Sequence, residues 1–592
     1  MAAAKDLKTP LLPSSDDYGR LSQPPSDADH QLHNPQLILD VIDHLDPSAS
    51  SNHETPTNEC SISINTQLDF DENPYGFIGS TGFEVPGSTT VDPFRNHTPK
   101  IEGVYEWVKL LICAPIALAR LVLFAFCLAI GYLATKFALS GWKDKQNPMP
   151  KWRCRVMWIT RLCTRGILFS FGYHWIQRKG KPAPREIAPI IVSNHVSYID
   201  PIFFFYELFP TIVASESHDS MPFVGTIIRA MQVIYVDRFS QQSRKHAVNE
   251  IKRKASSDRF PRLLLFPEGT TTNGRLLISF QHGAFIPGYP IQPVVVRYPH
   301  VHFDQSWGHI SLATLMFRMF TQFHNFMEVE YLPIVSPSEH HKESAVRFAE
   351  KTGRAMARSL NVVQTSHSFL DYLLLSKAAD SGHENPSLFV VEMAKIQQLF
   401  HLSSSDALDL LDRFLAMNPD SSGNVKIQDF LRVLRLKRCG LSEKMFEFID
   451  VGRNGKIIFK EFLVASAHVL NQPLFQQACE MAFTESDINQ DHYISEQEFG
   501  ASLMPAMGSL STDEIDGVFN LFDEDDDGRI SKGDFVNCLR KNPLLIALFS
   551  PHFMHKDLDQ NAAAVEVMSL HKVIDIKEPC EKKSINLMHM CV

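Results

Sequence analysis

The sequence predicts an α/β domain that follows an N-terminal membrane-embedded helical segment and precedes a C-terminal all-α domain. Strand-like and helix-like apolar patterns alternate between about residues 145 and 335, as they do in α/β domains. One long apolar stretch precedes this region, and four acidic loops at roughly regular spacing follow it. At 592 residues the chain has room for several domains and an ample core.

The first hundred residues are polar and acidic. Residues 1–100 hold 15 Asp and Glu against 5 Lys and Arg, a local net charge of −10. The stretch is rich in Pro, Ser and Asp and lacks the apolar core of a secretory signal peptide. We therefore expect a disordered acidic arm over residues 1–100.

The longest apolar segment lies within residues 101–142, and it is long enough to cross about 30 Å of hydrocarbon. Pro115 and Arg120 interrupt it. Either residues 121–139 span the membrane once, or two short helices form a re-entrant hairpin, the alternative that we favour. The hairpin keeps both flanks in the cytosol, whereas a single crossing puts the acidic arm in the lumen. A fully buried helix of a soluble protein is the third interpretation.

A basic block follows the apolar segment. Residues 143–185 hold 11 Lys and Arg against one acid, Asp144. This is typical of a cytosolic flank that faces anionic lipid. Nucleic-acid binding is the rival interpretation, but no RNA-binding or DNA-binding module accompanies the block, so we expect no nucleic-acid partner.

Residues 193–201 read Ser-Asn-His-Val-Ser-Tyr-Ile-Asp-Pro and follow an apolar strand. They place His195 and Asp200 five residues apart. On a helix such residues point about 140° apart, so the two meet only across a turn. There the carboxylate can fix the tautomer of the imidazole and raise its basicity. A His–carboxylate pair without a Ser or Cys nucleophile suits removal of a proton from a substrate hydroxyl.

Two further segments carry polar side chains at strand ends. Residues 263–274 run from an apolar strand through Phe-Pro-Glu-Gly-Thr into a loop whose N–H and hydroxyl groups suit a phosphate or polar head group. Residues 231–238 alternate as a strand that ends at Arg238, whose guanidinium can bind a phosphate through two hydrogen bonds. Structural roles are the alternative, with Glu268 as a loop cap and Arg238 as the partner of an acid.

The pattern ends with two more predicted strands, residues 289–296 and 327–332, and a predicted helix between them. The apolar residues of this helix recur at the spacing of one face. They are Leu312, Leu315, Met316, Met319, Phe320 and Phe323. We favour packing of this face on the sheet of its own domain over contact with lipid, although it can do both at opposite ends.

In this order the segments resemble the four sequence blocks of the glycerolipid acyltransferase family, over about residues 145–335. The second block of the family usually reads Gly-x-x-Phe-Ile-Asp-Arg; here Gln232 stands at the glycine, while Arg238 matches. The wider chain resembles the plant branch that carries C-terminal EF-hands and acylates lysophosphatidylethanolamine, in residues 90–95 and 360–367.

The resemblance implies acyl transfer from acyl-coenzyme A to the free hydroxyl of a lysophospholipid. Lysophosphatidylethanolamine is the favoured acceptor, and lysophosphatidylcholine, lysophosphatidylserine and lysophosphatidic acid are the alternatives. His195 is the expected general base and Asp200 the group that orients it. The residues expected to bind the acceptor are Arg238, for its phosphate, and Glu268, Gly269 and Thr270, which shape its pocket. A catalytically inactive, calcium-responsive membrane adaptor is the alternative function.

The same resemblance implies an endomembrane protein of the Golgi, the endoplasmic reticulum or the late endosome. Its catalytic domain faces the cytosol, because acyl-coenzyme A is cytosolic. The ten cysteines agree with this, since they include no Cys-x-x-Cys pair and predict reduced thiols.

Four segments in the C-terminal third match the EF-hand calcium loop. In the last, Asp534 replaces the usual Glu at position 12, which weakens calcium binding and favours smaller Mg²⁺. In the third, His492 replaces the turn glycine at position 6, and His tolerates the positive φ of that position better than β-branched residues do. The expected ligands are Asp487, Asn489, Asp491, Tyr493 and Glu498 in the third loop and Asp523, Asp525, Asp527, Arg529 and Asp534 in the fourth.

The two earlier loops are degenerate, and we expect them to keep the fold without an ion. The first loses charge and the second has no side chain at position 3. Their template positions are Asn418, Asp420, Ser422, Gly423 and Asp429, and Asp450, Gly452, Asn454, Gly455 and Glu461.

These patterns divide the chain into seven parts. They are a disordered arm at 1–100, a membrane segment at 101–142, an acyltransferase domain at 143–345, a helical linker at 346–400, a degenerate EF-hand pair at 401–470, a metal-competent EF-hand pair at 471–545 and a tail at 546–592.

Overall fold

The computed structural model describes residues 85–87, 91–142, 146–308, 310–338 and 343–549. Most of the predicted acidic arm and nearly all of the predicted tail lie outside these residues. The described chain forms two compact units. Residues 86–408 and 421–423 belong to the first, and residues 409–420 and 424–549 belong to the second.

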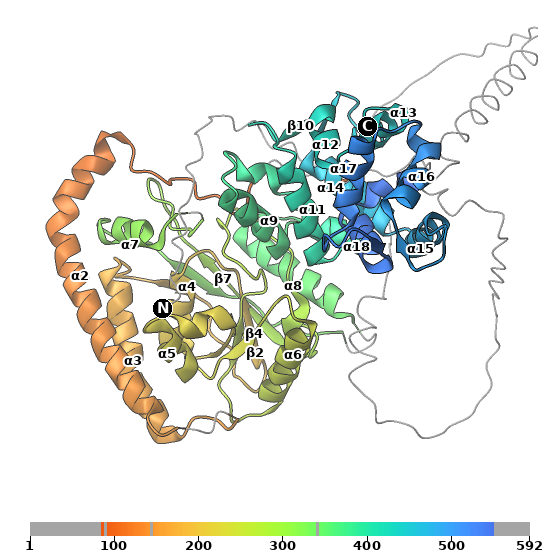
Figure 1. Ribbon diagram of the computed structural model, residues 1–592. Coiled ribbons are helices and arrows are strands. Elements are labelled where there is room, and N and C mark those ends of the chain that lie inside the picture. The colour runs from red at the N-terminus through yellow and green to blue at the C-terminus, as the bar shows by residue number, and fades with distance from the viewer. Residues whose placement is uncertain (1–84, 88–90, 143–145, 309, 339–342, 550–592) are drawn as a thin grey trace, which may run out of the picture. The chain divides into compact units, whose positions relative to one another are not determined.

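A mixed seven-stranded sheet forms the centre of the first unit (Figure 1). Its strand order is β1-β8-β7-β2-β5-β3-β4. β2 is parallel to both β5 and β7, so the carboxyl ends of these three strands lie at the same edge. The strands are β1 Gln177–Lys179, β2 Ile190–Ser193, β3 Thr211–Ser215, β4 Ile234–Val236, β5 Leu263–Leu265, β7 Ile291–Arg297 and β8 Glu328–Tyr331. A separate short pair joins β6 Leu276–Leu277 to β9 Val363–Gln364.

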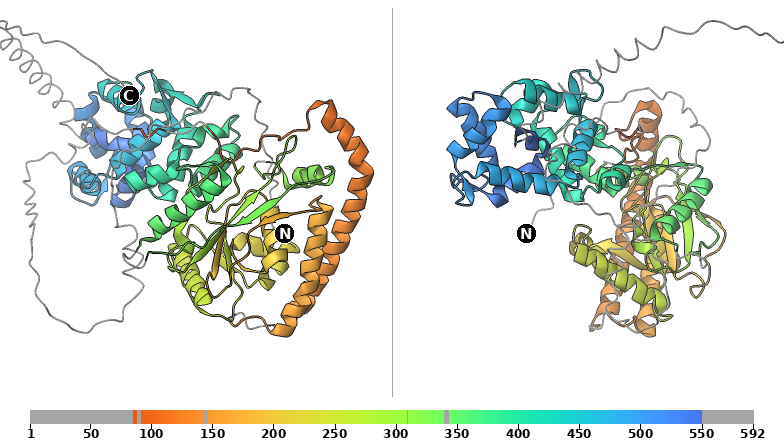
Figure 2. Two further views of the ribbon diagram at one scale, coloured as in Figure 1. Left: turned by 180° about the vertical axis from the view of Figure 1, so that it is seen from behind. Right: turned by 90° about the vertical axis from the view of Figure 1, so that its right-hand side faces the viewer.

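Helices cover both faces of this sheet, and the predicted α/β class is confirmed (Figures 1 and 2). Side chains of a strand alternate between the two faces. Ile191 therefore packs in the cluster with α3, α4, α5 and α7, while Ile190 and Val192 pack in the cluster with α6 and α8. The helices of this unit are α2 Gly103–Leu139, α3 Lys151–Ser170, α4 Ile199–Leu208, η2 Glu216–Ser220, α5 Val224–Ala230, α6 Gln241–Ser256, η3 His282–Ala284, α7 Leu312–Phe320, α8 Ala345–Leu360, α9 Phe369–Asp380, η4 Pro386–Phe389 and α10 Met393–Phe400.

The apolar segment forms one continuous helix, α2, which is long and apolar enough to cross a membrane by length and composition. The predicted division into two short helices is wrong, because α2 runs unbroken through Pro115 and Arg120. Arg120 is buried and donates to the backbone carbonyls of Gln322 and Phe323. A buried cation with such acceptors is tolerated, so it does not end the helix.

The two sides of α2 differ in character. Lys109 pairs with Glu106 and donates to the side chain of Gln322 at 2.8 Å, so these charges, like Arg120, lie on the side packed against the unit. Much of the remaining surface of α2 is exposed and apolar. Its exposed large side chains are Val104, Tyr105, Trp107, Val108, Leu111, Ile112, Ile116, Leu118, Leu121, Val122, Phe126, Leu133 and Phe137.

Some arginines of the basic block form hydrogen bonds within the fold. α3 packs lengthwise beside α2 (Figures 1 and 2), and three of its arginines donate to backbone carbonyls of the unit. Arg153 reaches Ser140 at 2.8 Å, Arg161 reaches Tyr206 at 2.8 Å, and Arg165 donates to the carbonyl of His174. These three side chains are therefore engaged by the fold, and contact of the block with anionic lipid stays a prediction.

The predicted amphipathic helix is α7, which ends at Phe320, before the predicted limit. Leu315 and Met319 are buried in the core against the sheet, as favoured from the sequence, while Leu312 and Phe323 are exposed.

The second unit contains paired helix–loop–helix elements. β10 Asn424–Lys426 pairs with β11 Lys456–Ile458, and β12 Tyr493–Ile494 pairs with β13 Ile530–Ser531, both antiparallel. Each pair of loops is thus joined by a short ladder, as EF-hands are. The helices are α12 Ile427–Val433, α13 Gly440–Ile449, α14 Phe459–Leu470, α15 Phe475–Ser486, α16 Glu496–Met507, α17 Thr512–Phe522, α18 Lys532–Lys541 and η5 Pro543–Phe549, and α11 Ser404–Ala416 runs across the boundary of the units.

Candidate active site

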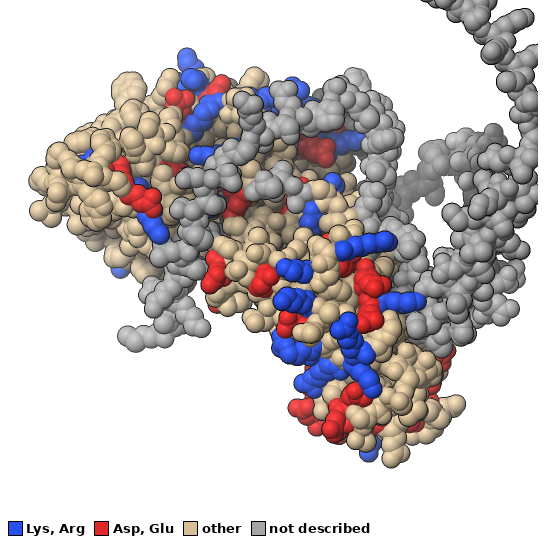
Figure 3. Space-filling model, turned by 90° about the horizontal axis from the view of Figure 1, so that it is seen from above, with Lys and Arg blue, Asp and Glu red and all other residues tan. Residues whose placement is uncertain are grey.

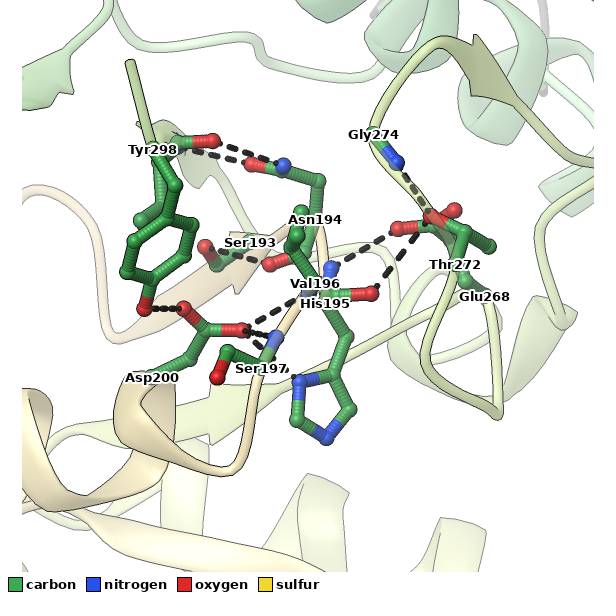
Figure 4. A network of polar contacts seen from close by, with 11 residues as sticks. Ser193, Asn194, His195, Val196, Ser197, Asp200, Glu268, Thr272, Gly274 and Tyr298 are labelled. Carbon is green, nitrogen blue, oxygen red and sulfur yellow. Dashed lines mark hydrogen bonds and ion pairs between the residues drawn. The ribbon is translucent and has the colours of Figure 1, made fainter. Parts of the chain in front are cut away.

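The turn between β2 and α4 brings His195 and Asp200 together (Figure 4). Nδ1 of His195 lies 2.9 Å from Oδ2 of Asp200. An ionised carboxylate only accepts hydrogen bonds, so the proton sits on Nδ1 and leaves Nε2 as the basic nitrogen. The predicted meeting of the two side chains across a turn is confirmed, and their catalytic role stays a prediction.

Asp200 is fully buried and surrounded by donors. Its Oδ2 also accepts the backbone N–H groups of Val196 and Ser197 at 2.8 and 2.9 Å, and its Oδ1 accepts the hydroxyl of Tyr298. Burial, with the charge of Asp200 next, raises the pKa of Tyr298 far above its ordinary value, so this hydroxyl remains a donor. The carboxylate therefore holds the turn and the imidazole in one arrangement.

The loop after β5 fixes the backbone of His195 from the other side. Oε1 of Glu268 accepts the N–H of His195 at 2.8 Å, and the carbonyl of His195 accepts the N–H of Thr272 at 2.8 Å (Figure 4). The imidazole stacks on Phe266 with ring centroids 4.2 Å apart. The side chain of His195 is 19% exposed, so the ring is not sealed from solvent.

Glu268 is fully buried, and burial raises its pKa to about 8. Its observed contact is with the backbone of the His195 turn, which matches the loop-cap alternative, and its predicted part in shaping the acceptor pocket is untested. Gly269 follows with φ of 77°, a left-handed conformation that suits glycine. Thr270 is 9% exposed.

Arg238 stands just beyond β4 and has no carboxylate within ion-pair distance among the described residues, so the alternative role as partner of an acid finds no support. Its guanidinium carbon lies 4.3 Å from the centroid of the Phe369 ring. The same Phe369 lies against Gly269, at 3.5 Å from where a Cβ would be. Phe369, the first residue of α9, therefore contacts both Arg238 and the loop after β5.

Sequence reasoning missed Tyr298 and Phe369. Tyr298 directly follows β7, the neighbour of β2 in the sheet, and an assumed parallel pairing of those strands would have suggested it. Phe369 opens α9 between Ser368 and Asp371, which form a capping box. That Ser-x-x-Asp spacing marks a helix start, but it does not reveal which arginine the helix reaches.

A further missed contact ties the chain before α2 to the site. The N–H of Asn273 donates to the carbonyl of Pro93 at 2.7 Å, and its side-chain amide donates to the carbonyls of Asp92 and Arg95. Residues 91–98 are therefore part of the acyltransferase fold, although the predicted arm extends to residue 100.

The fourth calcium loop has the geometry of a cation site. Ligand atoms of Asp523, Asp525 and Asp527 all lie within 4.8 Å of one another. Partial desolvation and repulsion from Asp527 and Asp534 raise the pKa of Asp525. Asp523 accepts the N–H groups of Asp527 and Gly528, which has φ of 79°. Crowded carboxylates around a tight turn fit a divalent cation bound through oxygen.

The third loop repeats this frame. Asp487 accepts the N–H groups of Asp491 and His492, and His492 has φ of 72°. His492 thus adopts the positive φ that position 6 requires. Glu498 reaches back to the N–H of Asn489 at 3.1 Å, so its carboxylate spans the loop. Position 7 of the two loops, Tyr493 and Arg529, would contribute backbone carbonyls.

The position-12 residues differ in reach. Asp534 accepts the N–H of Ser531 at 3.1 Å and its hydroxyl at 2.6 Å, as Glu498 accepts those of Ser495, but only Glu498 also accepts the N–H of the residue at position 3. Asp450 and Glu461 hold the second loop in the same closed form, but Gly452 supplies no ligand at position 3. These loops differ in ligands much more than in backbone.

The chain matches two family models, Acyltransferase over residues 176–297 and EF-hand domain pair over residues 475–540. It is 66% identical to the lysophospholipid acyltransferase LPEAT2 of Arabidopsis thaliana, over 87% of this chain and 96% of the relative. It is 31% identical to lysophosphatidylcholine acyltransferase 2 of Mus musculus, over 69% of this chain and 75% of the relative. The structure of the 1-acyl-sn-glycerophosphate acyltransferase PlsC from Thermotoga maritima aligns with 42% of this chain and 96% of its own, at 15% identity and a TM-score of 0.31, too low to support a functional conclusion.

Proposed function

Because the chain belongs to the lysophospholipid acyltransferases that carry EF-hands, we propose that it transfers an acyl chain from acyl-coenzyme A to the free hydroxyl of a lysophospholipid. Lysophosphatidylethanolamine is the favoured acceptor. Lysophosphatidylcholine, lysophosphatidylserine and lysophosphatidic acid are the other candidate acceptors.

The observation that carries the proposal is the His195–Asp200 pair. Its 2.9 Å contact leaves Nε2 of His195 basic, and the burial of Asp200 among four donors keeps the ring in place. A held imidazole with one free nitrogen is the group that general-base catalysis on a hydroxyl requires.

In the proposed reaction Nε2 of His195 takes the proton of the acceptor hydroxyl as its oxygen attacks the thioester carbonyl. An ester bond forms and the carbon–sulfur bond breaks. The imidazolium returns the proton to the departing coenzyme A thiolate. Asp200 stabilises the imidazolium in between. No covalent enzyme intermediate is needed, because both substrates are held together.

Arg238 is the proposed ligand of the acceptor phosphate. The residue is half-buried and has no ion-pair partner among the described residues, and burial lowers the pKa of its guanidinium. An anionic ligand offsets the cost of burying such a cation. Gly269 and Thr270 lie in the neighbouring loop and complete the proposed pocket with Glu268.

Calcium, in competition with Mg²⁺, is the proposed regulatory ion of the third and fourth loops. The ligands proposed for it are those predicted from the sequence, from Asp487 to Glu498 and from Asp523 to Asp534. The crowding of Asp523, Asp525 and Asp527 supports the fourth loop most directly. When bound, the ion would supply positive charge that offsets the repulsion between these carboxylates. It would take no part in acyl transfer.

The protein is a membrane enzyme, and we propose that α2 and α3 attach it to the cytosolic leaflet of an endomembrane. Aromatic contact of Tyr132 with Phe223 joins the C-terminal half of α2 to the unit, while Arg120 joins its middle. Because α2 packs along its length against its own unit, we favour a helix that lies in one leaflet over a helix that crosses the membrane. In Figure 3 the left-hand side, on which Figure 1 shows α2, carries few charged side chains.

The test is an acyl-transfer assay of the membrane-bound protein with acyl-coenzyme A and a panel of lysophospholipids, with calcium and with EGTA. We expect His195→Ala to lower turnover by about 10² to 10⁴ without releasing the protein from membranes. His218→Ala, at an exposed histidine, is the matched control. Retained turnover in His195→Ala contradicts the base assignment, and no turnover by the unaltered chain with any acceptor favours the inactive adaptor.

A further inference from the structure

Arg238 is a cation whose side chain donates no hydrogen bond to the described part of the protein; only its backbone carbonyl is engaged, by Arg244. The residue is half-buried, and burial lowers its pKa. Such a guanidinium needs either a ligand or a surface that holds it in place. The surface is present, since the ring of Phe369 lies 4.3 Å from the guanidinium carbon.

The aromatic contact is directional. A ring that covers the face of a guanidinium attracts its charge and leaves the N–H groups at its edge free. Those edge groups are the ones that bind a phosphate through two parallel hydrogen bonds. Phe369 also lies against Gly269, so one ring contacts both the arginine and the loop that carries Glu268.

We propose that Phe369 is a positioning residue of the acceptor site, which holds the guanidinium of Arg238 edge-on to the phosphate of the lysophospholipid. The inference rests on the proposed function, in which Arg238 binds that phosphate. It extends the site to α9, a helix beyond the residues of the matched acyltransferase model.

The ring of Phe369 is itself fixed from behind. It stacks on Tyr372 with centroids 6.1 Å apart, and Tyr372 meets Phe94 edge-on at 5.8 Å. Phe94 is buried and lies in the segment that Asn273 binds. A series of aromatic contacts thus runs from the guanidinium to the chain before α2.

Asp371 fixes the start of α9 as well. It is fully buried, and its Oδ2 accepts the N–H groups of Ser368 and Met393 at 2.8 and 2.9 Å, while its Oδ1 accepts the N–H of Val391 at 2.9 Å. Met393 begins α10, after which the chain continues into the EF-hand helices. Val391 and Met393, which lead through α10 to the EF-hand helices, therefore hold the start of α9 that carries Phe369.

The experiment compares Phe369→Leu with Phe369→Tyr in the full-length, membrane-bound protein. Leucine keeps most of the apolar volume but has no aromatic face, whereas tyrosine keeps the face. We expect Phe369→Leu to raise the KM for lysophosphatidylethanolamine roughly three- to thirtyfold, with little change in kcat or in the KM for acyl-coenzyme A. Phe369→Tyr should stay within about twofold of the unaltered protein. Equal KM values for the two variants would overturn the inference.

Arg238→Ala, measured alongside, separates this inference from the proposed function. If Arg238→Ala raises the acceptor KM and Phe369→Leu does not, the positioning role fails and the phosphate site stands. If Arg238→Ala changes nothing, the phosphate site itself fails. In the double variant the two effects should be less than additive, because both remove the same interaction. Phe239→Leu, at an exposed phenylalanine beside Arg238, is the control for a general loss of apolar surface.

A monoacylglycerol, an acceptor without phosphate, provides a second test. The variants at Phe369 should not differ from one another with this acceptor, since there is no phosphate for the held guanidinium to bind. A raised KM of Phe369→Leu for both kinds of acceptor would mean that the ring only shapes the pocket, and would overturn the inference.

Discussion

Asp200 in the acyltransferase unit and the aspartates of the fourth calcium loop use the same functional group in opposite ways. The two oxygens of Asp200 are occupied by a ring nitrogen, two N–H groups and a hydroxyl of the protein. Asp523, Asp525 and Asp527 face one another within 4.8 Å, and the charges of neighbouring acids help to raise the pKa of Asp525.

The difference shows how the surroundings of a carboxylate assign its role. A carboxylate saturated by protein donors has no capacity for a metal ion, and its charge acts on the group it holds, here the imidazole of His195. Carboxylates that repel one another are stabilised by an added cation. Substitutions at these residues test whether each carboxylate has the role that its surroundings assign.

The largest expected effect follows from Asp200→Asn. The amide keeps the shape of the carboxylate but loses its charge, so His195 is no longer held in one tautomer and its imidazolium is no longer stabilised. We expect kcat to fall by about 10³ to 10⁴, measured as acyl transfer in membranes. Asp258→Asn, at an exposed aspartate, should have no effect. Turnover of Asp200→Asn within tenfold of the unaltered protein would show that the pair does not act as proposed.

Removing the first carboxylate of each calcium loop should abolish ion binding and leave the His195–Asp200 pair intact. Replacing Asp487 and Asp523 by Ala removes position 1 of both loops. We expect the double variant to lose the calcium-dependent rise in unfolding midpoint, a stabilisation of about 2.7 kcal/mol for each loop when calcium is at 100 times its Kd. The midpoint is measured in detergent with calcium and with EGTA. Asp420→Ala, in the degenerate first loop, is the control, and an unchanged calcium response in the double variant would rule these loops out as the site.

The part of both sites that could be predicted is local in sequence. The spacing of His195 and Asp200 demands a turn, and the loop template places each ligand within twelve residues. His492 is an example: the loop template predicts a positive φ at its position, and His492 has one although it is not a glycine.

The part that could not be predicted depends on contacts between distant segments. Tyr298 meets Asp200 because β7 lies beside β2, and no local pattern encodes that strand order. Arg120 was expected to interrupt a helix, but carbonyl groups beyond the end of α7 satisfy it. Phe369 reaches Arg238 from a helix that belonged to the predicted linker.

Glu268 is a third case, because it is fully buried and its Oε2 has no hydrogen-bond partner among the described residues. Its pKa of about 8 exceeds the ordinary 4.5, so the folded protein keeps a proton that the unfolded chain releases. Its contribution to stability is complete below about pH 4.5 and is lost as the pH rises towards 8. Relative to Glu268→Gln, which cannot ionise, the unaltered protein should lose about 2 kcal/mol between pH 5.5 and 7. The two unfolding midpoints should therefore separate with rising pH, and midpoints that stay parallel would mean that Glu268 is ionised in the fold.

The smallest expected effect tests the reach of position 12. Both carboxylates accept the N–H and hydroxyl of the serine at position 9, but only Glu498 also reaches the N–H of Asn489, because Asp534 is shorter by one methylene. Asp534→Glu should let the carboxylate offer both oxygens to the ion. We expect calcium to bind this loop about tenfold more tightly, or about 1.4 kcal/mol, with a smaller gain for Mg²⁺, which prefers fewer protein ligands. Competition titrations of the two ions measure this selectivity, and Glu498→Asp should shift it the opposite way in the third loop. A gain for Mg²⁺ as large as that for calcium would show that side-chain reach at position 12 does not set the choice of ion.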